Sequence, residues 1–140
     1  MMNQVDHIGI AVRSIKKALP FYRDMLHLTC LGFEEVPSQK VKVAFLSAGH
    51  TKIELLESTD DNGPIAKFLE RRGEGVHHIA FQVKDIHGKL IELKERGIEL
   101  IDECPRNGAN KTQIAFLHPK VSNHVLIELC EKIGRDEDGR

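Results

Sequence analysis

Apolar and polar residues alternate along several short segments of the chain, which is the pattern of strands that bury one face. In residues 5–12, Ile8 and Ile10 fall on one side of such a strand, and His7 and Gly9 fall on the other. Turn-forming residues separate this segment and the others like it. The same pattern predicts further strands at about 28–36, 40–47, 51–57, 76–83, 98–103, 112–117 and 124–131.

Elsewhere apolar residues recur at three- and four-residue spacing, which predicts amphipathic helices. The first covers about 14–26, where Ser14 suits the N-cap and Pro20 is expected to lie early or to kink the helix. Two further helices are expected, at 64–71 and from Asp85 to Gly97.

The order of these elements repeats because the chain contains two similar copies of one pattern. Residues 6–12 recur as 77–83, an offset of 71, and residues 53–57 recur as 127–131, an offset of 74. We therefore predict an α+β fold of two tandem β-α-β-β-β modules that form a curled mixed sheet around a cup. The modules are expected at about 5–57 and 76–131, joined by helix 64–71 within a single domain, 1–131, and residues 132–140 are expected to form a mobile tail.

Composition narrows the range of partners. The 140 residues carry 20 basic and 21 acidic side chains, a formal net charge of −1, so neither nucleic acid nor a membrane surface is an expected partner. A small molecule is expected instead. Cys30, Cys104 and Cys130 are widely spaced, which is typical of reduced thiols, and no segment is apolar enough to span a membrane. The sequence predicts a cytoplasmic protein.

Two histidines and two glutamates occupy matching places in the two copies, on the polar side of their strands. Residues of like parity share one face of a strand. By that rule one cup receives His7, Glu54, His78 and Glu128. Imidazole nitrogen and carboxylate oxygen suit a divalent ion such as Zn, Co, Ni, Mn or Fe. The four residues are therefore predicted to form a metal site.

Each of these residues also has a structural interpretation. A single histidine on a strand is more often packed or exposed than a ligand, and duplication copies a structural residue as faithfully as a functional one. His77 falls on the other parity and is expected to be a packing or rim residue. Glycine-rich phosphate loops and nucleophile triads find no support in the sequence.

The repeated pattern, with histidine on the first strand of each copy and glutamate on the last, resembles the vicinal oxygen chelate (glyoxalase/bleomycin resistance/dioxygenase) superfamily. Within it the chain is most similar to the methylmalonyl-CoA epimerases, over residues 5 to about 131. The stretches that carry the resemblance are 6–12, 39–46, 53–57, 64–69, 75–81, 115–120 and 125–129. Residues 64–69 and 116–120 are the more specific of these.

The resemblance implies a divalent-metal-dependent epimerisation of methylmalonyl-CoA at C2, by proton abstraction and return through an enolate that the metal stabilises. Glu128 is the first candidate for one acid/base group and Glu54 for the other. A homodimer is a further implication. The alternatives are a glyoxalase I-like lyase or isomerase, favoured by the symmetric ligand set, and a non-catalytic small-molecule binding protein of the bleomycin-resistance kind.

Two stretches depart from the epimerase pattern. Some epimerases carry glutamine at the position of Glu54 and an acid on the preceding strand, but residues 41–44 contain no acid here. The loop 107–112 has Asn110 in the region where the family usually has a Gly-Ala-His-Gly-Lys sequence. The loop departure leaves the four predicted metal ligands unchanged.

Overall fold

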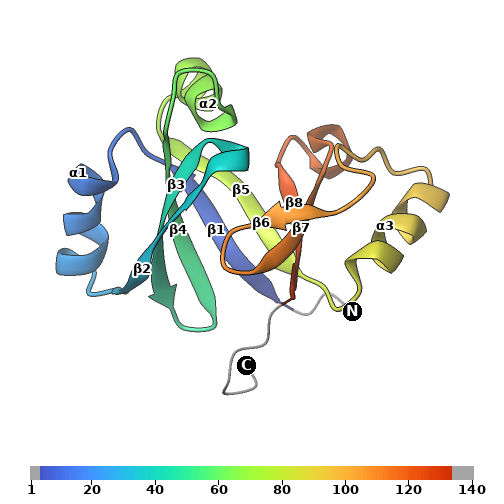
Figure 1. Cartoon of the computed structure of the whole chain (residues 1–140), viewed down its shortest axis with the longest axis horizontal. Helices are drawn as coiled ribbons and strands as arrows, with labels where there is room; N and C mark the ends of the chain where they lie inside the picture. Colours follow the sequence, from blue (N-terminus) through green and yellow to red (C-terminus); the bar gives the residue numbers. More distant parts are fainter. Residues whose placement is uncertain (1–3, 134–140) are drawn as a thin grey trace. The chain divides into compact units, whose positions relative to one another are not determined.

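The computed structural model describes residues 4–133, which divide into two compact units. The N-terminal unit comprises residues 7–77, and the C-terminal unit comprises the chain from His78 onward together with the residues up to Asp6. Each unit runs β-α-β-β-β along the chain (Figure 1). The predicted mobile tail lies outside the described residues from position 134 on.

The N-terminal unit is built on a four-stranded mixed sheet in the order β2-β3-β4-β1. β1 runs parallel to β4, and the other two pairs are antiparallel. Its elements are β1 (Val5–Ala11), α1 (Ile15–Leu19), the π-helix η1 (Pro20–Met25), β2 (Thr29–Val36), the 3-10 turn η2 (Pro37–Gln39), β3 (Val41–Ala48), β4 (Thr51–Ser58) and α2 (Pro64–Arg72).

The C-terminal unit repeats this arrangement in the order β5-β8-β7-β6, with β5 parallel to β8. Its elements are β5 (Gly75–Gln82), α3 (Ile86–Glu95), β6 (Arg106–Gly108), β7 (Thr112–Leu117), the 3-10 turn η3 (Pro119–Ser122) and β8 (Ile127–Lys132). In both units the first strand and the last strand are therefore hydrogen-bonded neighbours.

The last strand of each unit also holds the start of its helix. Ser14 caps α1 by accepting a hydrogen bond from the Lys17 amide at 3.2 Å, and Glu57 of β4 accepts one from the Ile15 amide at 2.7 Å. Both contacts satisfy amide groups that a helix leaves unpaired at its N-terminus. The negative charge of Glu57 also lies at the positive end of the helix dipole.

The second copy reproduces this pair of contacts. Asp85 caps α3 by accepting from the Gly88 amide at 3.1 Å, and Glu131 of β8 accepts from the Ile86 amide at 2.9 Å. The repeat thus preserves how each helix is fixed to its sheet, in addition to the order of the elements.

Pro20 changes the first helix as the sequence predicts. α1 ends at Leu19, and the chain continues as a π-helix in which the Leu26 amide bonds the Phe21 carbonyl at 2.9 Å. Proline has no amide hydrogen, and its ring crowds the carbonyl four residues earlier. The wider turn that follows is therefore a consequence of this one residue.

Each unit packs its helix against the apolar face of its own sheet. In the N-terminal unit the buried cluster comprises Val12, Ile15, Leu19, Ala44, Leu46 and Leu55, with Ile10 and Ile53 against it. In the C-terminal unit it comprises Val83, Ile86, Leu90, Ala115, Leu117 and Leu129, with Ile127 against it. The alternation of apolar and polar residues along the strands predicts these apolar faces. The polar residues of the same strands lie on the opposite faces.

The prediction of a strand at 98–103 is wrong. Only Leu100 forms an isolated bridge, to Leu117, because the Phe116 carbonyl accepts from both the Ile101 and Asp102 amides. The Asp102 carboxylate takes the Phe116 amide at 2.9 Å, which a pairing strand would otherwise use. The edge strand forms later instead, as β6, within a segment that the sequence predicts to be a loop.

The start predicted for the last strand, at 124, is also too early. Asn123 and His124 both have left-handed backbones, with φ of 61° and 68°, and the His124 amide closes the preceding turn on Pro119. The strand therefore begins at Ile127. Of the described residues, none belongs to a helix long and apolar enough to cross a membrane.

Candidate metal and substrate site

The N-terminal unit brings His7 and Glu54 together. His7 lies on β1 and Glu54 on the parallel neighbour β4, and the register places Gly9 beside Glu54. His7 Nδ1 is 3.3 Å from Glu54 Oε2, and the residues are only 5% and 7% exposed. Because glycine has no side chain, the two can approach across the strand pair.

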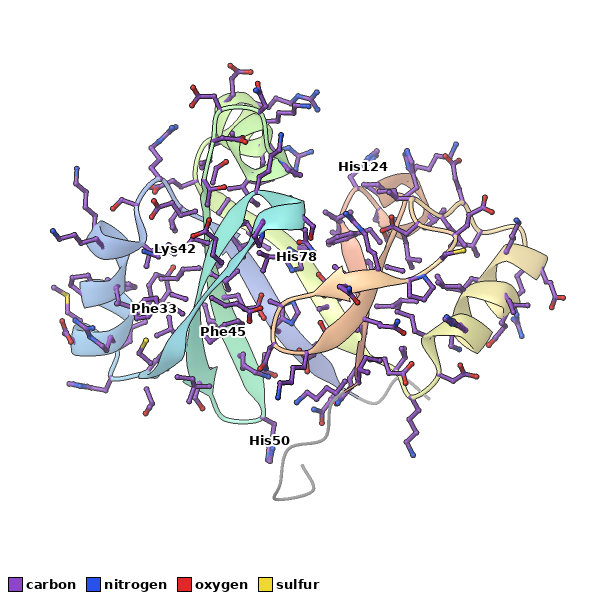
Figure 2. All side chains as sticks on the ribbon, viewed as in Figure 1. Phe33, Lys42, Phe45, His50, His78 and His124 are labelled. Atoms are coloured by element: carbon purple, nitrogen blue, oxygen red, sulfur yellow. The ribbon has the colours of Figure 1, made fainter. Side chains whose placement is uncertain are left out.

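The C-terminal unit forms the equivalent pair. His78 of β5 places Nε2 3.2 Å from Glu128 Oε1 of β8, and both residues are buried. Ala80, which is fully buried, lies beside Glu128 in the register. The small residue at the position equivalent to Gly9 plays the same part here. His78 of β5 is labelled in Figure 2.

Both pairs fit a divalent metal ion. Nitrogen and oxygen ligands lie about 2.0–2.2 Å from an ion such as Zn²⁺, so two ligands on one ion are roughly 2.8–3.6 Å apart for bond angles between about 90° and about 109°. The separations of 3.3 and 3.2 Å fall in this range. Burying a carboxylate is costly unless it is paired or coordinates a metal, and a bound divalent ion would meet that requirement.

An aromatic residue lies next to each pair. Phe45 of β3 is opposite Glu54 in the register, and Phe116 of β7 is opposite Glu128. The Phe116 ring meets the His78 ring edge to face, with centroids 5.8 Å apart. Both phenylalanines are 8% exposed. The repeated Ala-Phe-Leu sequence at 44–46 and 115–117 was the signal that could have identified them as site residues.

His77, which the sequence places on the opposite face from His78, packs against α2. Its ring meets that of Phe68 edge to face, with centroids 5.1 Å apart. Burial disfavours the charged imidazolium and lowers the pKa of His77 from 6.5 to about 4. His77 is therefore a neutral packing residue of the N-terminal unit over the physiological pH range.

The other histidines have no matched partner in the repeat. In Figure 2, His50 lies at the turn between β3 and β4, and His124 lies in the turn before β8. His118 accepts a hydrogen bond from the Lys120 amide through Nδ1, at 3.1 Å. This group lies in turns, loops or a helix and stays unassigned; its members are His27, His50, His87, His118 and His124.

The fold and the paired histidines and glutamates define a class of protein. Residues 6–116 match the family model of the Glyoxalase/Bleomycin resistance protein/Dioxygenase superfamily, and the chain belongs to that family. The superfamily and fold class predicted from the sequence are confirmed.

Individual relatives are similar over nearly the whole chain. An uncharacterized Bacillus subtilis protein is 49% identical over 133 residues, which are 95% of each chain. The ethylmalonyl-CoA/methylmalonyl-CoA epimerase of Cereibacter sphaeroides is 37% identical over 131 residues, covering 92% of this chain and 98% of the epimerase.

A solved structure gives the same similarity in three dimensions. It is a Streptomyces coelicolor methylmalonyl-CoA epimerase variant in complex with 2-nitronate-propionyl-CoA. The epimerase is 32% identical, with a TM-score of 0.91, and the alignment covers 96% of this chain and 97% of the other.

Proposed function

We propose that this chain is a divalent-metal-dependent methylmalonyl-CoA epimerase. The observation that carries the proposal is the pair of buried histidine–glutamate contacts at equivalent places of the repeat, in a chain similar over its length to known epimerases. The four residues proposed to hold one ion are His7, Glu54, His78 and Glu128.

When bound, a divalent ion supplies Lewis-acid polarisation of the thioester carbonyl, which acidifies the C2 hydrogen. The residues of the chain then have to move the proton. Epimerisation needs a proton taken from one face of C2 and returned to the other, so it needs two acid/base groups. Glu128 is proposed as the first, and Glu54, its counterpart in the other copy, as the second.

The choice of Glu54 follows from what its neighbours lack. β3 carries Val43 and Phe45 on the sheet face of Glu54, and neither can exchange a proton. Some epimerases have an acid on this strand and glutamine at the place of Glu54. In this chain the acid is instead on β4, so we place the second proton transfer there.

A glyoxalase I-like lyase or isomerase is the second candidate, because both copies contribute one histidine and one glutamate. The test is turnover of the hemithioacetal of methylglyoxal and a thiol, measured beside the CoA ester. Turnover of the hemithioacetal alone would replace the epimerase proposal. The binding-protein alternative is less favoured, since bleomycin-resistance proteins generally lack the metal ligands present here.

The epimerase proposal is tested by elemental analysis of the purified protein before and after chelation, together with activity on methylmalonyl-CoA. Activity that disappears with the metal and returns on reloading supports it. Bound metal without activity on this ester contradicts the reaction but leaves the metal site, and failure to bind any divalent ion contradicts the site. The homodimer and the cytoplasmic location stay predictions.

A further inference from the structure

Arg106, the first residue of the edge strand β6, is held in a defined position on the C-terminal unit. Its Nε lies 3.4 Å from Asp102 Oδ1, and its guanidinium carbon lies 5.5 Å from the centre of the Phe116 ring. The other oxygen of Asp102 accepts the Phe116 amide at 2.9 Å. Asp102 and Phe116 therefore fix the guanidinium together.

The Phe116 ring also contacts a residue of the candidate metal site. Phe116 contacts His78 edge to face at 5.8 Å and is paired across the strands with Glu128. Arg106 of β6 pairs with Ile114 of β7, which lies two residues before Phe116 on that strand. Arg106 therefore lies on the same face of the sheet as Ile114 and Phe116. A single aromatic ring thus separates the cation from a candidate metal ligand.

The guanidinium remains reachable from solution. The Arg106 side chain is 46% exposed, whereas Asp102 is 17% exposed. In the described part of the chain, its polar contact is made by Nε, on one edge of the guanidinium. The two Nη groups form the edge that binds the oxygens of carboxylates and phosphates in pairs.

We propose that Arg106 binds an oxyanion of the substrate. This inference rests on the proposed function, because a methylmalonyl-CoA molecule carries two kinds of oxyanion, the acyl carboxylate and the phosphates of CoA. Both suit the planar fork of arginine. Stacking on Phe116 orients the guanidinium before the ligand arrives, which reduces the entropy lost on binding.

The test measures binding of three ligands to wild type, Arg106→Gln and Arg106→Lys. The ligands are methylmalonyl-CoA, propionyl-CoA, which lacks the acyl carboxylate, and CoA. Calorimetry should give roughly 10- to 100-fold weaker binding by Arg106→Gln, the range for a charge-assisted hydrogen bond. Arg106→Lys should recover part of that loss, since it keeps the charge but not the fork.

The pattern across ligands identifies the oxyanion. Loss for methylmalonyl-CoA alone assigns the carboxylate, and equal loss for all three assigns a phosphate. In turnover, Arg106→Gln should raise KM by a similar factor and change kcat by less than about threefold, as expected for binding shared by ground state and transition state.

Arg96→Gln is the matched control, because Arg96 is a more exposed arginine of the same unit that pairs with Glu92 within α3. It should bind all three ligands as wild type does. Should Arg106→Gln not fold, Arg106→Lys carries the test: weaker binding than wild type supports the role of the guanidinium, and binding equal to wild type overturns it.

Two failures are distinguishable. Suppose that wild type binds and turns over methylmalonyl-CoA, and that Arg106→Gln binds each of the three ligands as tightly as wild type does. Only the role of Arg106 is then overturned. If wild type binds none of the esters, the proposed function is contradicted, and the inference is overturned with it.

Discussion

The proposed chemistry depends on four residues whose burial and close pairing make them unusual. His7, Glu54, His78 and Glu128 are polar, nearly fully buried and paired within 3.3 Å of a partner. Strand parity predicts them from the sequence, because side-chain alternation is a local property. The repeated Ala-Phe-Leu sequence signals Phe116, but Arg106 could not be predicted, since its importance depends on its contacts with Asp102 and Phe116 in the folded unit.

Glu128→Gln should lower turnover of methylmalonyl-CoA by roughly 10²- to 10⁴-fold, the usual loss when a general acid/base is removed. The amide keeps the shape of the side chain but cannot take the proton. His78→Ala should instead lose chiefly bound metal, measured by elemental analysis. Glu95→Gln, an exposed glutamate at the end of α3, is the control. Normal turnover and metal content in both site variants would refute these roles.

His77 should make stability depend on pH. Its folded pKa of about 4 lies below the ordinary value of 6.5, so the unfolded chain binds the proton more readily. The contribution of His77 to the free energy of unfolding is therefore fully present above about pH 6.5. It is lost as the pH drops toward about 4, by on the order of 3 kcal/mol at most. Urea titrations of metal-free protein between about pH 7 and about pH 4.5 measure the loss.

The matched variants are His77→Gln, which should flatten this pH dependence, and His50→Gln, which should leave it as in wild type. His50 is suitable because it is exposed at the turn between β3 and β4. Equal pH dependence in wild type and His77→Gln would show that His77 is not the responsible group.

At the scale of elements, each unit uses its last strand to fix its helix. Glu57 and Glu131 contact the first amides of α1 and α3, and the sequence contains both as part of one repeated strand. Most element positions could be predicted because periodicity and caps are local signals. Residues 98–103 are the exception: their alternation suggests a strand, but the Asp102 carboxylate accepts the Phe116 amide that a pairing strand would use.

Glu57→Ala and Glu131→Ala should each lower the free energy of unfolding by about 1–2 kcal/mol, since each removes a charged acceptor from a helix N-terminus. Chemical denaturation measures both losses. They should be similar in size, because the contacts are equivalent in the repeat. Glu95→Ala, which removes an exposed carboxylate at the other end of α3, should change stability by less than about 0.5 kcal/mol. A loss confined to one copy would contradict the equivalence.

In the whole molecule one β-α-β-β-β unit occurs twice, and each copy supplies half of the proposed ligand set. The matching offsets make this duplication visible in the sequence. The register of β1 with β4 and of β5 with β8 then explains why the histidine and glutamate of each copy meet. We propose that the two histidine–glutamate pairs bind one ion between them, which makes metal binding a property of the complete chain.

Metal binding should therefore stabilise the chain as a single event. At a free metal concentration of about 100 Kd the gain is about 2.7 kcal/mol, which raises the midpoint of thermal unfolding by roughly 9 °C. His7→Ala and His78→Ala should both abolish this shift, and elemental analysis should find one ion per wild-type chain. A shift of half the size in each variant would mean that the two pairs bind metal independently.

The proposed reaction is removal and return of the C2 proton of methylmalonyl-CoA by this chain. The most direct measurement is deuterium incorporation at C2 when metal-loaded protein and substrate are mixed in D2O. Incorporation should accompany interconversion of the two epimers, disappear on chelation and fall strongly in Glu128→Gln. No incorporation by fully metal-loaded wild type would contradict it.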